Sequence, residues 1–396
     1  PAFCEELTTL VKRFNDRVER CAGDREAAAR VSNGGVDVVL IRLHGQERFE
    51  THGEQTVRAA KNGRAPIVVL SQPLPVTQLA NHHQQGVTYH VIEPFHPREL
   101  LSCVYALMRR QRRVVCLGGG TGLYTLLLGL KTLPGVHLTS VVNMSDDGGS
   151  TGRIREAFGI LPPGDIRRSL VALSAAPQLM TDLIQYRFAG GEGLKDHNLG
   201  NLLLTAMVDL TGSMAEAVRA MGDILNIQGL VLPVTATNTT LVAEFSDGTL
   251  VRGERAIDVP GNRDPRLRIA RLWQEPTAEA NPNALSALLS ADVITIGPGD
   301  LFTSVVATLT VQGIAEAIRL SGARTIYICN LMTKPGETSG FTAADHLREI
   351  LRYVGEDVLD EVLVSNTPLS TTTLHQYTLK DQEPVRLGDV ARVKHV

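Results

Sequence analysis

Short apolar runs alternate with amphipathic stretches in the first 112 residues of the chain. A continuous apolar run of a few residues is typical of a strand covered on both faces, and apolar residues three or four positions apart are typical of a helix. Strands that alternate with helices predict a parallel sheet, so we expect residues 1–112 to form a flavodoxin-like α/β domain. The expected strands are residues 16–21, 36–43, 66–70 and 88–92, and the expected helices are residues 5–15, 24–31 and 97–110.

The rest of the chain repeats one pattern four times: an apolar strand, a loop rich in glycine or aspartate, and the start of a helix. The carboxyl ends of parallel strands meet at one edge of a sheet, so the loops predict a ligand site at that edge. We expect residues 113–396 to form a nucleotide-binding domain with a three-layer α/β/α, Rossmann-like parallel sheet. The four loops are residues 118–122, 144–153, 297–304 and 330–342.

Two segments of this second domain are interpreted as β-hairpins. Apolar and polar residues alternate at 238–252 around Ser246-Asp247-Gly248, which predicts a hairpin with a tight turn. This small insertion is expected to project from the main sheet. Residues 229–235 are interpreted as a further hairpin region.

The loop at residues 118–122 is a candidate anion site. Glycine has no Cβ, so backbone amides can approach a ligand closely, and the helix that follows offers unpaired N–H groups and a positive dipole end. Such a loop predicts a cradle for a phosphate or pyrophosphate. Leu123 replaces the last glycine of the dinucleotide fingerprint and no Gly-Lys-Ser/Thr follows, so neither common nucleotide motif is present. The candidate residues are Gly118, Gly119, Gly120, Thr121 and Gly122.

Charged residues follow the second strand of this domain. Asp146 and Asp147 can hold ribose hydroxyls, bind Mg²⁺ beside phosphates, or form a turn, and the sequence leaves these three interpretations open. Asp165 is the expected N-cap of the next helix, which places Arg167 and Arg168 in its first turn. A cation there opposes the helix dipole at a cost of a few tenths to about 1 kcal/mol, so we expect Arg167 in particular to face an anion.

Further polar residues complete the candidate ligand site. His197 and its neighbours precede an apolar helix, and their ring and amide groups can bond a base, a sugar or a phosphate. The histidines show no His-x-x-x-His or cysteine partner spacing, which disfavours zinc, and no Gly-x-Ser-x-Gly elbow indicates a serine hydrolase. These candidates are Asn143, Ser150, Thr151, His197, Asn198, Asn201, Gly297, Gly299 and Thr303.

Composition narrows the functional classes. The 396 residues carry a net charge of -3, which argues against a large nucleic-acid surface, and the arginines at 109–113 are interpreted as a solvated helix end. Five scattered cysteines suit a reducing cytoplasm, and no apolar run approaches the roughly 20 residues of a membrane span. No secretory signal is visible, and the first residue is Pro1, so part of the natural N-terminus is expected to be missing.

The N-terminal segments at residues 36–43, 66–71 and 89–101 resemble a response-regulator receiver domain. The usual opening strand with its acidic pair is absent, Arg42 stands at the phosphoacceptor position, Glu93 at the lysine position, and only the hydroxyl position survives, as Ser71. Without the carboxylates, neither a Mg²⁺ site nor acyl-phosphate chemistry is expected. We interpret this part as a degenerate receiver used for docking or dimerisation. An unrelated flavodoxin-like domain is the alternative.

From about residue 113 to about residue 366 the chain resembles the CofD/YvcK superfamily. One branch of that superfamily transfers a phospholactyl-type group from a guanosine diphosphate conjugate to a deazaflavin with Mg²⁺. The other, the gluconeogenesis factors, is known for binding UDP-sugars and for roles in carbon metabolism and cell-wall morphogenesis. Residues 229–235 and 332–342 look more like this second branch. The motifs that carry the resemblance are residues 118–122, 145–152, 162–167, 197–202, 297–304 and 334–342.

Two residues depart from the family pattern. Asp196 stands where glycine usually precedes the histidine, and Asp300 stands where serine usually follows Pro-Gly. Asp300 would place a negative charge beside the proposed phosphate pocket, which is unfavourable unless the side chain caps the helix or binds a metal.

The resemblance implies a regulatory protein that binds a UDP-GlcNAc or UDP-glucose type ligand without turnover, and we expect it to be a cytoplasmic homodimer. The alternative is a Mg²⁺-dependent transferase acting on a guanosine diphosphate ester, with the metal at Asp146 and Asp147. A dinucleotide oxidoreductase is disfavoured by the broken fingerprint. A protein partner of the receiver-like domain is expected, whereas nucleic acid and a membrane span are not.

Overall fold

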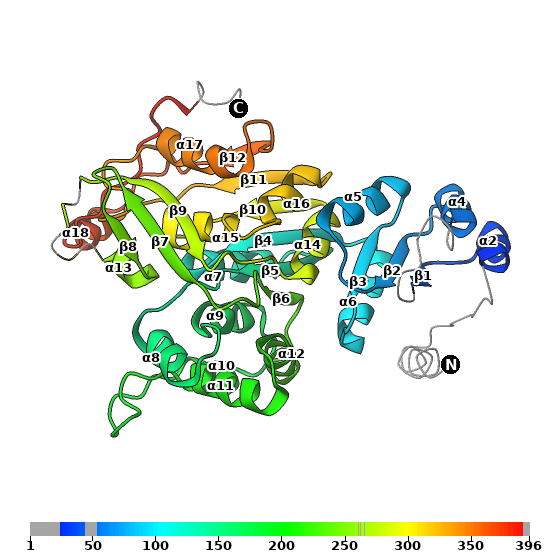
Figure 1. The fold of residues 1–396 in the computed structure, drawn as a ribbon, viewed down its shortest axis with the longest axis horizontal. Helices are drawn as coiled ribbons and strands as arrows, with labels where there is room; N and C mark the ends of the chain where they lie inside the picture. The colour runs from blue at the N-terminus through cyan, green and yellow to red at the C-terminus, as the bar shows by residue number, and fades with distance from the viewer. Residues whose placement is uncertain (1–23, 44–53, 260, 262, 265, 391–396) are drawn as a thin grey trace.

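The structure is a computed structural model, and it describes residues 24–43, 54–259, 261, 263–264 and 266–390. The helix expected at residues 5–15 and the strand expected at 16–21 lie outside these residues. The described chain contains two parallel sheets and one antiparallel sheet (Figure 1). Among the described residues, no helix has both the length and the apolar character needed to cross a bilayer.

The N-terminal part contains a three-stranded parallel sheet in the order β1-β2-β3. Every position of β2 and β3 is buried, which explains why these strands appear in the sequence as continuous apolar runs. Helices α4 and α5 were not expected, because their sequences are largely polar. The elements are α2 (Asp24–Ser32), β1 (Val39–Arg42), α4 (Glu54–Gly63), β2 (Ile67–Ser71), α5 (Val76–Gln85), β3 (Tyr89–Ile92) and α6 (Pro97–Met108).

The main sheet has six strands, all parallel, in the order β12-β11-β10-β4-β5-β6. The chain runs outward from β4 in one direction and then outward from β10 in the other. This is the doubly wound order of a Rossmann-like sheet, and the strand order reverses between β4 and β10. The strands are β4 (Arg112–Gly118), β5 (Val136–Val142), β6 (Leu230–Pro233), β10 (Val293–Ile296), β11 (Arg324–Ile328) and β12 (Glu361–Leu363).

Helices cover both faces of the main sheet, and one face carries an extra helical layer. Helix α9 is buried along almost its whole length between strands β5 and β6 and the helices α10, α11 and α12, which lie below it in Figure 1. The expected three layers are therefore present, and the extra layer was not predicted. The helices of this domain are α7 (Gly120–Leu130), α8 (Gly149–Phe158), α9 (Gly164–Leu173), α10 (Gln178–Gln185), α11 (Leu199–Thr211), α12 (Met214–Ile224), α14 (Pro282–Leu289), the π-helix η1 (Leu301–Val306), α15 (Ala307–Leu309), α16 (Ile314–Leu320) and α17 (Ala343–Val354).

An antiparallel sheet in the order β8-β7-β9 is inserted between β6 and β10. The expected hairpin is present: the amide of Gly248 donates to the carbonyl of Phe245 at 2.9 Å and closes its turn. The third strand was not predicted. The elements of this insertion are β7 (Thr240–Phe245), β8 (Leu250–Arg252), α13 (Glu254–Asp258) and β9 (Ile269–Glu275).

The interpretation of residues 229–235 as a hairpin region is wrong. Residues Leu230–Pro233 form β6, which pairs in parallel with β5 as an edge strand of the main sheet. An apolar strand of four residues has no periodicity that separates a parallel edge strand from one arm of a hairpin.

The N-terminal part packs against the amino ends of the main strands. The guanidinium of Arg113, at the start of β4, bonds the carboxylate of Asp292 and also donates to the carbonyl of Thr88 at 2.9 Å. The hydroxyl of Ser286 in α14 donates to the carbonyl of His90 at 2.6 Å. The carboxyl ends of the main strands are at the opposite edge of the sheet, away from this contact (Figure 1).

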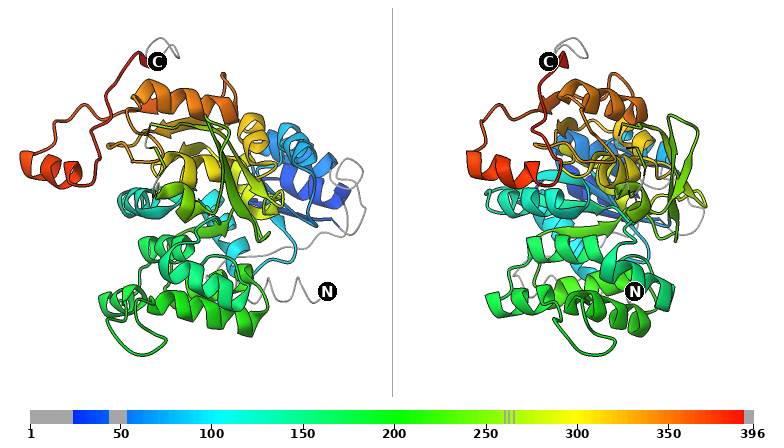
Figure 2. Two further views of the ribbon diagram at one scale, coloured as in Figure 1. Left: turned by 60° about the vertical axis from the view of Figure 1, so that its left-hand side comes forward. Right: turned by 90° about the vertical axis from the view of Figure 1, so that its left-hand side faces the viewer.

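The C-terminal segment returns along the carboxyl edge of the sheet. The amide of Thr333 donates to the carbonyl of Glu383 at 2.7 Å, and the amide of Val385 donates to the carbonyl of Leu331 at 3.0 Å. Helix α18 (Thr371–Thr378) has no buried residue and stands away from the rest of the molecule (Figure 2).

Candidate functional site

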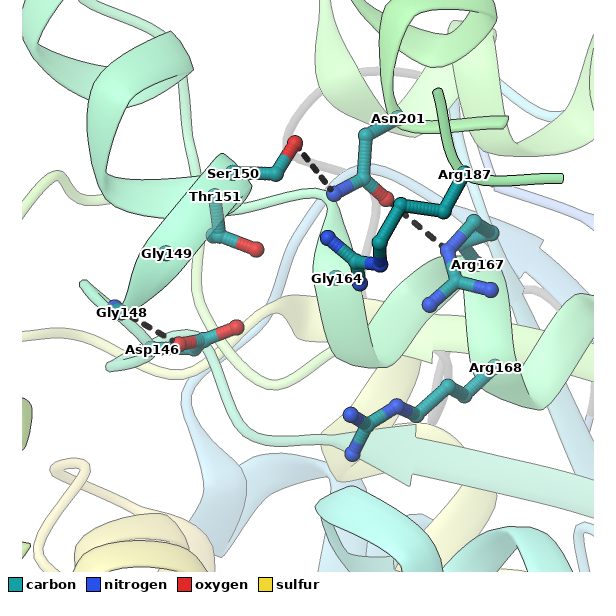
Figure 3. A pocket seen from close by; sticks show the side chains of 10 residues that line it. All are labelled: Asp146, Gly148, Gly149, Ser150, Thr151, Gly164, Arg167, Arg168, Arg187 and Asn201. Atoms are coloured by element: carbon teal, nitrogen blue, oxygen red, sulfur yellow. Dashed lines mark hydrogen bonds between the residues drawn. The ribbon is translucent and has the colours of Figure 1, made fainter. Parts of the chain in front are cut away.

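A cavity of about 230 Å³ opens at the carboxyl edge of the main sheet (Figure 3). Helices α8 and α9 both begin at this cavity, and their N-cap residues, Gly148 and Pro163, provide no side-chain cap. Backbone N–H groups at two helix starts are therefore directed toward one space, which favours an anion. The lining residues are Asp146, Gly148, Gly149, Ser150, Thr151, Gly164, Arg167, Arg168, Arg187 and Asn201.

Three arginines give the cavity its charge. Arg167 is 8% exposed, and its Nε donates to the Oδ1 of Asn201 at 2.9 Å. Burial lowers the pKa of Arg167 to about 10, so the guanidinium is still cationic at neutral pH. Arg168 lies 3.7 Å from the Asp165 carboxylate, and Arg187 donates to the carbonyl of Asp196 at 2.6 Å. Figure 3 shows the three guanidinium groups gathered around the cavity.

Asp146 is the acidic residue that lines the cavity. Its Oδ1 accepts a hydrogen bond from the amide of Gly148 at 2.9 Å, and burial raises its pKa. Asp165 lies nearby: burial, followed by the charge of Asp146, raises the pKa of Asp165 to about 6. The charges of Asp146 and Asp165 thus interact across the start of α9.

The prediction that Asp165 is an N-cap is wrong. The N-cap of α9 is Pro163, and Asp165 lies inside the first turn, where its carboxylate accepts a hydrogen bond from the amide of Gly120. A Cβ on Gly119 would stand 2.4 Å from the Oδ2 of Asp165, so a side chain at this position would displace that carboxylate. Asp165 therefore ties α9 to the glycine loop that follows β4.

Asp147 points away from the cavity. Its two carboxylate oxygens accept hydrogen bonds from the amides of Glu254 at 3.0 Å and Arg255 at 2.7 Å, the first residues of α13. A carboxylate at a helix start satisfies unpaired amides and matches the dipole. Asp147 thus anchors the insertion to the loop after β5. Glu254 is half-buried, and desolvation followed by the nearby charge of Asp146 raises its pKa to about 9.

The glycine loop at residues 118–122 does not line the cavity. A Cβ on Gly122 would lie 2.6 Å from the carbonyl oxygen of Pro298, so this glycine allows the loops after β4 and β10 to cross closely. Gly118 accepts from the amide of Asn143 at 2.8 Å. The remaining members, Gly120 and Thr121, begin α7. The loop packs the switch point of the sheet and supports the neighbouring cavity.

The loop after β10 is occupied by a side chain of the protein itself. The buried carboxylate of Glu337 accepts from the amide of Phe302 at 2.9 Å and from the amide and hydroxyl of Thr303 at 3.3 and 2.7 Å. The side-chain amide of Asn143 donates to the Thr303 carbonyl at 2.9 Å. Gly297 and Gly299 lie in the turn that leads into this helix start. The polar groups of Asn143, Thr303 and Glu337 bond one another, and these residues do not line the cavity.

Asp300 stands at the N-cap position of η1, but its side chain makes no capping hydrogen bond. Its carboxylate bonds the Nζ of Lys334 at 2.6 Å, and the same ammonium group also bonds Asp258 and lies 3.7 Å from Glu337. These three carboxylates raise the pKa of Lys334 above its ordinary range. The unfavourable charge expected of Asp300 is therefore neutralised by a lysine 34 residues further along the chain.

The segment around His197 combines local structure with the cavity wall. Asn198 is the N-cap of α11, and its side chain accepts from the amide of Asn201 at 3.1 Å. The Nδ1 of His197 lies 3.2 Å from the Ser150 hydroxyl, so the ring supports α8 next to the cavity. Asp196 has a φ of 64°, a left-handed conformation that glycine adopts readily and that aspartate adopts more easily than most other residues.

The structure thus divides the candidate residues of the sequence. Five line the cavity, and the others support it or its neighbours. Sequence reasoning missed Gly148, Gly149, Gly164 and Arg187 and left Arg168 open. Residues Gly148, Gly149 and Gly164 lie in the motifs already noted, whereas Arg187 stands outside any motif. The five candidates in the lining are Asp146, Ser150, Thr151, Arg167 and Asn201.

The match to a known family begins at the boundary between the N-terminal part and the main domain. Residues 114–396 match the model of the family described as 2-phospho-L-lactate transferase CofD. A gluconeogenesis factor of Halalkalibacterium halodurans is 46% identical over 276 residues, covering 70% of this chain and 84% of that protein. The gluconeogenesis factor of Bacillus subtilis is 41% identical over 278 residues, covering 70% of this chain and 86% of that protein.

A solved structure has the same fold. The crystal structure of a member of the UPF0052 family from Bacillus halodurans superposes with a TM-score of 0.67 at 45% identity, covering 70% of this chain and 88% of that one. With the family model and the relatives, this similarity covers the six-stranded sheet and the cavity at its edge. The chain therefore belongs to the CofD/UPF0052 family, in which its relatives carry the name gluconeogenesis factor.

Proposed function

We propose that this protein binds a nucleotide-sugar of the UDP-GlcNAc or UDP-glucose type in the arginine-lined cavity and acts as a regulator without catalytic turnover. The observation that supports this most strongly is the convergence of Arg167, Arg168 and Arg187 with two uncapped helix starts. Guanidinium groups and helix-start amides are the donors that recognise phosphate oxygens. The diphosphate is accordingly the part of the ligand placed in the cavity.

The size of the cavity agrees with this placement. A volume of about 230 Å³ lies below the roughly 300–1,000 Å³ of pockets that enclose a drug-sized ligand. The diphosphate would fill it, while the nucleoside and sugar would extend along the carboxyl edge. Ser150 and Thr151 offer hydroxyls and Asp146 an acceptor for the sugar or ribose hydroxyls at the cavity rim.

Mg²⁺-dependent transfer from a guanosine diphosphate ester is the second candidate, and the pairing of Asp146 with Asp165 favours it. The half-buried carboxylate of Asp146 and the buried carboxylate of Asp165, whose charges interact, are the kind of oxygen donors that Mg²⁺ accepts beside phosphates. Asp147 is bonded to the amides of α13, so the ion would be held by Asp146 and Asp165 instead. When bound, the ion would neutralise charge on the bridging oxygens, and Arg167 and Arg168 would hold the phosphates.

Calorimetry separates the two candidates. UDP-GlcNAc and UDP-glucose are titrated into the wild-type protein with and without Mg²⁺, and then into Asp146→Ala and into Asp357→Ala, an exposed control outside the cavity. Binding of a UDP-sugar without Mg²⁺, weakened about tenfold by Asp146→Ala and unchanged by the control, supports the regulator. No detectable binding of UDP-sugars, together with Mg²⁺-dependent binding of a guanosine diphosphate ester, would overturn the regulator proposal.

For the N-terminal 112 residues we propose a degenerate receiver domain that docks a protein partner. Three parallel strands in sequence order support this proposal. The Nε of Arg42 bonds the Oε1 of Glu93 at 2.8 Å. A cation therefore stands at the position of the phosphoacceptor aspartate, and a carboxylate stands at the position of the lysine. Ser71 is buried at the end of β2. We also propose that the protein acts in carbon metabolism and cell-wall morphogenesis and that it is located in the cytoplasm.

A further inference from the structure

A second cavity, of about 420 Å³, opens at the amino edge of the main sheet, at the opposite ends of the strands from the arginine-lined cavity. We call it the junction cleft, because the chain passes along it from α6 of the N-terminal part into β4 of the main domain. Its volume lies within the roughly 300–1,000 Å³ of pockets that hold small ligands. The lining residues are Leu107, Arg110, Gln111, Arg112, Arg113 and Asp292.

The acidic residue of the junction cleft is already paired. The carboxylate of Asp292 accepts hydrogen bonds from the Nε and Nη2 of Arg113 at 3.1 and 2.8 Å, and a third from the backbone amide of Arg113 at 2.7 Å. A two-pronged contact of this kind fixes both side chains and offsets their charges. The negative charge in the cleft is therefore directed at Arg113, and the other two arginines of the lining form no ion pair with it.

Arg110 and Arg112 supply the unpaired positive charge. Both are exposed, and neither guanidinium forms an ion pair or a hydrogen bond with another residue of the described chain. Gln111 between them is half-buried, and its side-chain amide likewise has no partner among the described residues. A cation just after the end of α6 suits the helix dipole, which accounts for Arg110 but not for Arg112, the first residue of β4.

We propose that the junction cleft binds a small molecule that carries a phosphate monoester. Arg110 and Arg112 hold the phosphate oxygens, the Gln111 amide donates a further hydrogen bond, and Leu107 packs against the carbon skeleton of the ligand. Guanidinium groups pair with phosphate oxygens through two parallel N–H donors. A monoester carries a charge of about -1.5 to -2 at neutral pH, which matches two arginines. A phosphodiester or a carboxylate carries a single charge and leaves one arginine unmatched.

The proposed site joins the two parts of the molecule. Leu107 belongs to α6, whereas Arg112 and Asp292 belong to the main domain. Arg113 of the same cleft also donates to the carbonyl of Thr88 in the N-terminal part at 2.9 Å. A ligand that contacts both parts should stabilise their packing, because it binds the assembled junction and not the separated one. The site is independent of the proposed nucleotide-sugar site, which lies at the carboxyl edge of the sheet.

Calorimetric titration of the full chain with inorganic phosphate and with glucose 6-phosphate tests the proposal, with glucose as the uncharged control. Arg112→Ala should weaken binding of glucose 6-phosphate about tenfold, because a charge-assisted pair of donors is lost. Arg167→Ala is titrated in parallel, since the arginine-lined cavity also attracts phosphate. Binding that persists in Arg167→Ala and weakens in Arg112→Ala is expected from the junction cleft.

Arg110→Gly separates binding from folding. Arg110 has a φ of 52°, which glycine adopts without strain, so the variant should unfold at the temperature of the wild-type protein or above it. It should nevertheless bind glucose 6-phosphate about tenfold more weakly. Arg64→Gly is the matched control: Arg64 is an exposed arginine with a φ of 58° outside the cleft, and its loss should leave the affinity unchanged.

Four results would overturn the proposal. The first is no detectable binding of either phosphate compound, and the second is binding of glucose as tight as that of glucose 6-phosphate. The third is an affinity that is unchanged in both Arg110→Gly and Arg112→Ala, or that falls equally in Arg64→Gly. The fourth is phosphate binding that disappears entirely in Arg167→Ala, which would assign all of it to the arginine-lined cavity and leave the proposed function intact.

Discussion

Two loops at the carboxyl edge of the sheet look alike in sequence and differ in what their helix-start amides face. The loop after β5 and the loop after β10 are both rich in glycine, aspartate, serine and threonine, and each precedes a helix start. At the first, the amides of α8 face a cavity lined by arginines. At the second, the amides of Phe302 and Thr303 are bonded to the carboxylate of Glu337.

The difference shows that a glycine-rich helix start can be filled by an anionic side chain of the protein itself, in which case it is not open to a ligand. Glu337 arrives from a segment 34 residues beyond Thr303 and brings Lys334 with it. The lysine offsets part of the negative charge of the three carboxylates around it, and the helix start of the second loop is filled by groups of the protein itself. The following predictions test this contrast between the open loop and the filled loop.

Replacing Glu337 by alanine should have the largest effect on stability. The substitution leaves the buried amides of Phe302 and Thr303 and the Thr303 hydroxyl without their acceptor, at a cost of about 1–3 kcal/mol for each unsatisfied group. Urea denaturation measures it. Glu337→Gln, which keeps one acceptor oxygen, should cost less. A cost below about 1 kcal/mol for Glu337→Ala would mean that the second loop is not held by this carboxylate.

Replacing Arg167 by alanine should instead act on the ligand. Loss of one buried charge-assisted donor is expected to weaken UDP-sugar binding by about 1.5–3 kcal/mol, roughly 10- to 100-fold. Calorimetry gives the affinity, and Arg271→Ala, an exposed arginine in β9, serves as the control. Equal losses in the two variants would show that the arginine cavity is not the phosphate site.

Asp165 should give the protein a pH dependence that its asparagine variant lacks. Its pKa rises from 3.8 unfolded to about 6 folded, so the folded state holds the proton more tightly between these values. The stabilisation is fully present below about pH 4 and is lost as the pH rises through 6, by about 1–2 kcal/mol. Urea denaturation at pH 4.5 and pH 7.5 compares the two proteins. A larger loss in Asp165→Asn would contradict the assignment.

Replacing Asp300 by serine should have the smallest effect. The side chain is 41% exposed and its ion pair with Lys334 is shared with two other carboxylates, so a loss below about 1 kcal/mol is expected. UDP-sugar affinity should change by less than twofold. A tenfold change would place the second loop in contact with the ligand and remove the contrast between the two loops.

The sequence predicted the elements that depend on local pattern. Strands such as Ile67–Ser71 and Tyr89–Ile92 were found close to their expected positions, because continuous burial requires continuous apolar runs. The hairpin at β7 and β8 followed from its turn residues. The short strand β6 was misread, because four apolar residues do not distinguish a parallel edge strand from a hairpin arm.

The parts that the sequence did not predict depend on contacts between distant residues. No local signal shows that Glu337 bonds the helix start at Thr303, that Asp147 caps α13, or that Arg187 reaches the cavity. Asp165 has the position of an N-cap in the sequence, but the chain turns into the helix at Pro163 and places the carboxylate under the glycine loop. These positions follow from the packing of the whole sheet edge.

The position of the N-terminal part determines how a partner could influence the cavity. It packs at the amino ends of the strands through Arg113 and Ser286, whereas the cavity lies at the carboxyl ends. A macromolecule on the N-terminal part and a small ligand in the cavity can thus occupy one molecule together without competing. Any communication between them must be a coupling free energy, and it must be reciprocal: the partner changes ligand affinity by the same factor as the ligand changes partner affinity.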